Sequence, residues 1–195
     1  MADLITLEDY KTAMKITGFG DDTRLTSLIA SASQLVKTYC NNTFVDFYSS
    51  NKTETFNMDY DSYSVSLEEV PLNTVVSVEE RQTIQADYVT LVNNEEYYID
   101  YETDSILRSD GGSGYKNFPR GPGAVRVVYT GGYSACPADL KLAVIDLVTY
   151  YHKDEYKQRQ TIAGATLQNS STSSQRNNPG FPDHIKRVLD MYKNF

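Results

Sequence analysis

The chain has 195 residues, 40% of them hydrophobic, and a formal net charge of −8 at pH 7. This size and composition suit one domain, or one domain with a sizeable insertion, and the lack of clustered lysines and arginines argues against sequence-independent DNA binding. No apolar run approaches the ~20 residues that cross a bilayer, and the first residues do not resemble a signal peptide, so we expect a protein made in a cytosol that does not contact membranes.

Two helices are predicted in the first 42 residues. Thr6 suits the N-terminal cap of the first helix, with Glu8 and Asp9 in the first turn, where the helix dipole favours acids, and Gly18 to Gly20 should end it. The second helix should begin at Asp21 or Asp22 and continue to Cys40, because its apolar residues recur at helical spacing. These residues are Leu25, Leu28, Ile29, Ala32, Leu35, Val36 and Tyr39.

Residues 43–133 are predicted to form a β-rich insertion. Short runs rich in Tyr, Val, Thr and Phe alternate with turn residues, which is typical of antiparallel hairpins. The predicted strands are Thr43–Tyr48, Thr53–Met58, Ser64–Leu67, Thr74–Glu80, Tyr88–Val92, Tyr97–Tyr101, Ser105–Arg108 and Ala124–Tyr129. The segment Ser109–Gly123 holds five of the eleven glycines and two prolines, so it is expected to be a mobile loop.

The last third of the chain returns to helix. Pro137 suits the first position of a long core helix that occupies most of residues 134–161 and should run to about Gln158. Residues 162–195 are expected to form a polar, flexible linker and a short C-terminal docking helix that begins near Pro182. The predicted fold class is therefore α+β, with a helical core (residues 1–42 and 134–161), an antiparallel β-rich insertion and a C-terminal arm.

A search for chemistry finds no candidate catalytic, cofactor-binding or metal-binding residue. The two histidines, His152 and His184, have no second ligand at metal-binding spacing. The run that starts at Asp59 lacks the Gly and Glu that a calcium loop needs, and Gly111–Lys116 lacks the Gly-Lys-Ser/Thr of a phosphate loop. Cys40 and Cys136 are expected to be small buried thiols.

Several segments, in this order along the chain, resemble head–tail connector (adaptor) proteins of tailed bacteriophages. They are the starts of the two N-terminal helices, two stretches of the β-rich region, the strand that ends in Tyr-Gly-Gly-Tyr, and the long helix. In this sequence they read Ile5–Glu8, Asp21–Ser33, Val70–Val78, Tyr97–Asp100, Val125–Tyr133 and Pro137–Ala143 followed by Tyr150–His152.

The resemblance implies a helical core that carries a β insertion, and a structural role in the virion without a catalytic site. It implies a homo-oligomeric ring, typically of twelve copies, that lies beneath the portal protein and meets the next tail or neck protein. DNA would pass through such a ring without specific binding. The acidity of the chain fits a surface that does not hold DNA, although solubility explains it equally well.

We expect the ring contact to involve the apolar stripe of the long helix, because this stripe is broader than the packing of two helices requires. Its residues are Val144, Leu147, Val148 and Tyr151.

The C-terminal helix is expected to be a portal-docking arm, with its apolar residues at the spacing of a helix laid into a groove. These residues are Ile185, Val188, Leu189 and Tyr192. The alternative is that the same residues pack on the chain's own core, because a helix this short needs a surface to lie on.

Three other functions compete with the connector role. A head-closure or tail-completion protein would be based on a β-barrel, and the strong helices argue against it. A carbohydrate-binding β-module could use the tyrosines of the insertion as stacking platforms, but it would not need the long helices. The third alternative is an enzyme whose site leaves no sequence motif.

Overall fold

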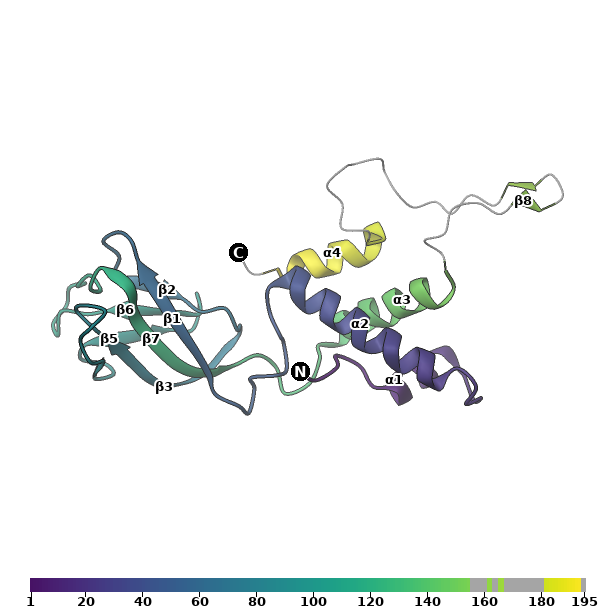
Figure 1. Ribbon diagram of the computed structural model, residues 1–195, viewed down its shortest axis with the longest axis horizontal. Coiled ribbons are helices and arrows are strands. Elements are labelled where there is room, and N and C mark those ends of the chain that lie inside the picture. Colours follow the sequence, from purple (N-terminus) through teal and green to yellow (C-terminus); the bar gives the residue numbers. More distant parts are fainter. Residues whose placement is uncertain (155–160, 163–164, 167–180, 194–195) are drawn as a thin grey trace. The chain divides into compact units, whose positions relative to one another are not determined.

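The computed structural model describes residues 1–154, 161–162, 165–166 and 181–193. The chain divides into two compact units, a helical unit formed by Met1–Asn41 with Ala135–Phe195, and a β unit formed by Asn42–Ser134 (Figure 1). Helices and antiparallel strands thus occupy separate parts of the chain, which confirms the predicted α+β class.

The helical unit contains α1 (Leu7–Met14), α2 (Asp22–Cys40), α3 (Ala138–His152) and α4 (Asp183–Met191), together with a small pair of strands, β8 (Thr161–Ile162) and β9 (Ala165–Thr166). The hydroxyl of Thr6 accepts a hydrogen bond from the Asp9 backbone N–H at 3.0 Å, and the Asp9 carboxylate accepts one from the Thr6 N–H at 3.1 Å. This capping box fixes the start of α1 as predicted.

The ends of two helices differ from the prediction. Helix α1 ends at Lys15, before the glycines, because Lys15 adopts a left-handed conformation with φ 55°. Helix α3 ends at His152 and does not run to Gln158, because Asp154 is left-handed as well, with φ 55°. Its N–H donates to the Tyr151 carbonyl at 3.2 Å, which turns the chain out of the helix.

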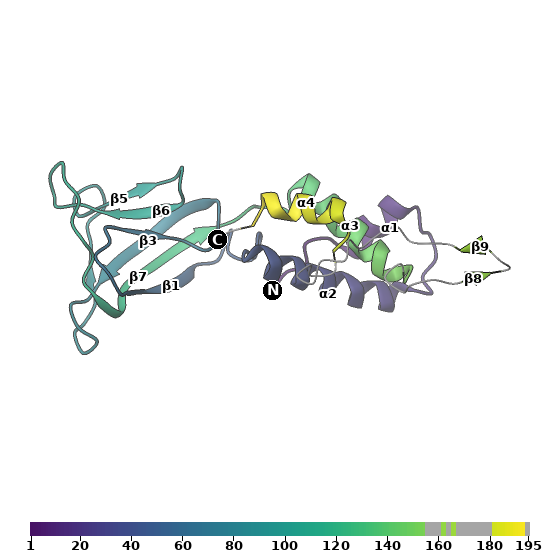
Figure 2. The same ribbon diagram turned by 90° about the horizontal axis from the view of Figure 1, so that it is seen from above.

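The core of the helical unit lies between α2 and the two later helices (Figure 2). Helix α3 packs against α2 on one side and against α4 on another. Most of the buried side chains are apolar and come from α1 to α4, and each buried apolar side chain stabilises the fold by about 1.5–3 kcal/mol. They include Tyr10, Leu25, Ile29, Val36, Leu140, Val144, Leu147, Val148, Ile185 and Leu189.

The β unit consists of two antiparallel sheets. The larger has the order β1 (Lys52–Met58), β7 (Gly121–Gly131), β3 (Leu72–Glu80) and β4 (Val89–Thr90); the smaller has the order β2 (Ser64–Ser66), β6 (Ser105–Arg108) and β5 (Tyr97–Asp100). Strand β7 lies between β1 and β3, and Val125, Val127 and Tyr129 are fully buried at alternate positions along it. Side chains of both sheets share one apolar core.

The predicted strand Thr43–Tyr48 is wrong. Phe44 has a φ of 66° and is buried, and its carbonyl accepts a hydrogen bond from the Tyr133 N–H at 2.6 Å. The close approach requires a glycine at position 132, because a Cβ there would collide with the Phe44 carbonyl oxygen. The segment is therefore a turn that ties the two ends of the β unit together.

The segment Ser109–Gly123 is not the open loop that its glycines predict. Ser109 pairs with Tyr115 in an isolated bridge, and Phe118 is buried, with its N–H bonded to the Ser62 carbonyl at 2.9 Å. The last residues already belong to β7, which begins at Gly121. The aromatic side chains of this segment pack against the β unit, and a prediction based on its glycine content does not account for this packing.

Candidate interaction surfaces

The four residues expected at a ring contact lie inside the chain's own helical unit. Val144, Leu147 and Val148 are fully buried, and Tyr151 is half-buried beside Tyr150, with ring centroids 5.5 Å apart. The broad apolar surface of α3 has two partners in the same chain, α2 and α4, and these account for its breadth. Because these side chains are buried or half-buried, they have little accessible surface for a contact with a neighbouring subunit.

The residues expected in a docking arm also face the chain's own core. Ile185 and Leu189 are buried, whereas Val188 and Tyr192 are half-buried, and α4 lies against α2 and α3. Packing on the chain's own core, the alternative that the sequence left open, is thus the arrangement in this structure, and portal docking stays a prediction.

Polar contacts also attach α4. The Tyr192 hydroxyl donates to the Asp139 carboxylate at 2.7 Å, and the Tyr39 hydroxyl donates to Asp190 at 2.5 Å. Burial, together with the hydrogen bond to Asp190, raises the pKa of Tyr39 to about 12. The Cys40 thiol lies 3.6 Å from the Leu189 carbonyl oxygen.

The thiols are poorly suited to act as nucleophiles. Cys40 is buried and Cys136 half-buried, so the expectation of two buried thiols is confirmed only for the first. Burial raises the pKa of Cys40 to about 12 and that of Cys136 to about 11. Both thiols are therefore protonated at neutral pH.

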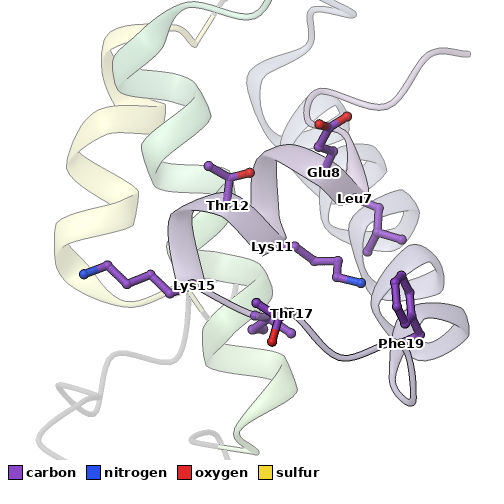
Figure 3. A pocket seen from close by; sticks show the side chains of 8 residues that line it. Leu7, Glu8, Lys11, Thr12, Lys15, Thr17 and Phe19 are labelled. Atoms are coloured by element: carbon purple, nitrogen blue, oxygen red, sulfur yellow. The ribbon is translucent and has the colours of Figure 1, made fainter.

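The first open surface is a groove of about 680 Å³ along α1, which we call the α1 groove. It is lined by Leu7, Glu8, Lys11, Thr12, Lys15, Ile16, Thr17 and Phe19 (Figure 3). The Phe19 ring is 81% exposed, and Lys11 extends over it with its amine 4.4 Å from the ring centroid. The same amine pairs with Asp22 at 2.8 Å. From the sequence, Gly18 to Gly20 were predicted only to end a helix, and no sequence pattern indicated the exposed aromatic ring between them.

The second open surface is a groove of about 610 Å³ on the outer face of the smaller sheet, which we call the tyrosine groove. It is lined by Tyr98, Asp100, Tyr101, Glu102, Leu107, Arg108, Ser109, Gly112, Ser113, Gly114 and Tyr115. Tyr98 lies opposite Leu107 on neighbouring strands, and the next row on this face pairs Asp100 with Ser105.

The β unit is held together by buried charges. The Arg108 guanidinium is 2% exposed and pairs with the Glu80 carboxylate through two hydrogen bonds of 3.0 Å. A second group surrounds the Lys52 amine, which lies 2.7 Å from Glu54, 2.8 Å from Glu68 and 3.2 Å from Glu69. Burial opposes the charge on Lys52, but hydrogen bonds to these carboxylates prevail and raise its pKa. Both groups have structural roles.

Within residues 1–154 and 181–193, no group of three or more His, Cys, Asp or Glu side chains is placed to hold a metal ion. No helix in the described part of the chain is both long and apolar enough to cross a membrane.

Solved structures of phage-like particles share the fold. A chain in the neck of an empty gene transfer agent (GTA) particle, computed with C6 symmetry, aligns with a TM-score of 0.60 and 14% identity over 98% of this chain and 90% of that chain. A chain in the virion of a native GTA particle gives 0.59 at 13% identity, with the same coverage. A chain in the native GTA neck, computed with C12 symmetry, gives 0.54 at 13% identity over 100% of this chain and 94% of that one. The protein thus has the fold of neck proteins.

The sequence identifies the family. Residues 3–195 match the head completion protein family, and the chain belongs to it. The head completion protein of Escherichia phage T5 is 40% identical over 72 residues, which make up 36% of this chain and 39% of that protein. The match thus spans well under half the length of this curated relative. The family match confirms the resemblance to phage head–tail proteins.

Proposed function

We propose that this protein is a non-enzymatic connector that forms a ring, of twelve copies by its resemblance, between the portal and the next neck or tail protein. The observation that carries the proposal is the family match over residues 3–195. The genome passes through the ring, and the net charge of −8 per chain disfavours retention of its phosphates. The chain needs no cofactor for this role.

The α1 groove is the proposed contact with the next copy in the ring. A closed ring of identical subunits needs two different, complementary patches on each subunit. Within the helical unit, α1 and α4 lie on opposite sides of α2 and α3 (Figure 1). The exposed side chains Leu142 on α3 and Met191 at the end of α4 provide apolar contacts away from the groove, suited to the exposed Phe19 ring of a neighbour.

The head-closure alternative rests on a β-barrel design, whereas this chain devotes α1 to α4 to a separate helical core. The helical core favours the connector.

The test is a cryo-electron microscopy map of the virion neck, combined with mass spectrometry of complete virions and of tailless heads. We expect the chain in both kinds of particle, as one closed ring next to the portal, with α1 of each copy against its neighbour. A chain found only in detached tails, or as a single copy in the neck, would contradict the proposal.

A further inference from the structure

The tyrosine groove combines aromatic rings with uncompensated negative charge. Tyr98 and Tyr101 are each 57% exposed and Tyr115 is 66% exposed, so three rings stand open to solvent at one hollow. Tyr115 is fixed in place, because its ring stacks on Tyr63 with centroids 4.5 Å apart and its backbone bridges to Ser109. Such a surface is pre-organised for a partner and loses little entropy on binding.

Two carboxylates line the hollow beside these rings. Asp100 accepts hydrogen bonds from the Thr103 hydroxyl at 2.7 Å and from the Glu102 N–H at 3.0 Å, which hold its pKa below the usual range and keep it charged. Glu102 is exposed next to it. The Asp100 carboxylate is therefore negatively charged at neutral pH.

No cation within the groove balances these acids. Among the described residues that line it, Arg108 is the one basic side chain, and its guanidinium is committed to Glu80 and to the carbonyls of Glu96 and Ser109. Lys116 follows Tyr115 in the sequence but does not line the groove. A ligand therefore meets open aromatic faces and two carboxylates together.

We propose that the tyrosine groove binds an arginine-bearing segment of another virion protein, which rests on the proposed function in so far as the partner belongs to the virion. A guanidinium stacks on tyrosine faces and forms paired hydrogen bonds with carboxylates, so this surface complements it on both counts. The volume of about 610 Å³ accommodates a few side chains and so fits a short segment. The acids repel nucleic acid phosphates.

The binding test uses the full chain and short peptides tiled across the other structural proteins of the same phage. Each arginine-containing peptide is made twice, once with arginine and once with citrulline, which has nearly the same shape but no charge. By fluorescence anisotropy we expect some arginine peptides to bind, and citrulline to weaken their binding at least about tenfold.

Variants of the chain locate the binding. We expect Tyr98→Ala and Glu102→Gln to weaken the same peptides by similar factors, with unchanged far-UV circular dichroism, because both side chains are exposed. The matched control is Tyr60→Ala, an exposed tyrosine of the β unit that does not line the groove. The proposal is overturned if no peptide distinguishes arginine from citrulline, if Tyr60→Ala weakens binding as much as Tyr98→Ala, or if a glycan array gives a signal that depends on Tyr98.

A second measurement separates this proposal from the connector role. A photo-crosslinking amino acid is introduced as Tyr98→p-benzoylphenylalanine, with the same change at Tyr60 as the control, and virions are irradiated. We expect Tyr98 to crosslink to another virion protein through an arginine-containing peptide. If the chain is incorporated but Tyr98 crosslinks no other protein, the groove proposal alone fails. If the chain is absent from particles, the connector role fails.

Discussion

The two units of this protein differ in the kinds of side chain that they bury. The helical unit buries mainly apolar side chains in stripes along α2, α3 and α4, with Lys37 as a charged exception. The β unit buries several charged groups, such as Glu54, Glu69, Glu80 and Arg108. The apolar stripes follow from local spacing in the sequence. The ion pairs join residues that are distant in sequence, as with Glu80 and Arg108. Each charge in such a pair is stabilised in its buried position by the other charge. The helical unit should therefore respond to volume and charge at single positions, and the β unit to the pairing of its charges.

The largest effect is expected from Val148→Asp in the helical unit. Val148 is fully buried between helices of its own chain, so the aspartate would be an unpaired buried charge that costs several kcal/mol. We expect the helical unit to lose its folded structure, seen as a fall in far-UV circular dichroism. Val148→Ala should remain folded. A stable Val148→Asp protein that still enters virions would contradict the description of this core.

The second effect tests the β unit through Arg108→Ala. Removal of this guanidinium leaves the buried Glu80 carboxylate without its partner, which should lower the free energy of unfolding by about 3–5 kcal/mol. Urea denaturation measures the change. Arg120→Ala is the matched control, because Arg120 pairs with Asp61 at 2.7 Å with both side chains 60% exposed, and its removal should leave the unfolding midpoint nearly unchanged.

A double variant sharpens this test. Replacing both partners, Arg108→Met with Glu80→Met, removes the charges together and should recover much of the stability lost in Arg108→Ala. If the double variant is as unstable as the single one, the bidentate pair is not what makes Arg108 important.

The third effect concerns α4. Leu189 is fully buried against the other helices, so Leu189→Ala should destabilise the helical unit by about 2–5 kcal/mol, measured as a lower unfolding midpoint in urea. Val188→Ala, at a half-buried neighbour, should cost less. Equal and negligible effects of the two changes would show that α4 is dispensable for the fold and would favour the docking-arm interpretation.

The smallest effect on stability is expected from Phe19→Ser. The ring is 81% exposed, so its loss should change the free energy of unfolding by less than about 0.5 kcal/mol. Incorporation into particles, followed by mass spectrometry, should nevertheless fall, because the proposed contact between copies loses its main apolar group. Ile84→Ser removes another exposed apolar side chain, 62% exposed, from the β unit and should leave incorporation unchanged.

The positions of the helices and strands could be predicted from the sequence better than the contacts between them. Helical spacing located α2 and α4, and alternation located β3, β5 and β6, because these patterns are local. The same apolar stripe on α3 was interpreted as a contact between copies, since periodicity reports that a face is covered but not by what. The partner was α4, which lies more than thirty residues further along the chain.

Other features depend on contacts that no short window contains. The left-handed residues Lys15 and Asp154 end their helices without a glycine to signal it. The pair Glu80 and Arg108, and the meeting of Tyr98 with Tyr115 at one groove, arise only when strands and loops distant in sequence come together. The spacing of residues along the sequence does not show which distant residues meet in the fold, so neither groove was predicted.

The hydrogen bond that joins the Phe44 carbonyl to the Tyr133 N–H has an evolutionary consequence. It brings together the two points at which the chain starts and finishes the β unit, so this unit is a cassette closed at its own base. The insertion can therefore lengthen, shrink or be exchanged for another without stretching the helices on either side. The closed base thus allows new recognition surfaces to be built on the β unit while the helical scaffold is kept.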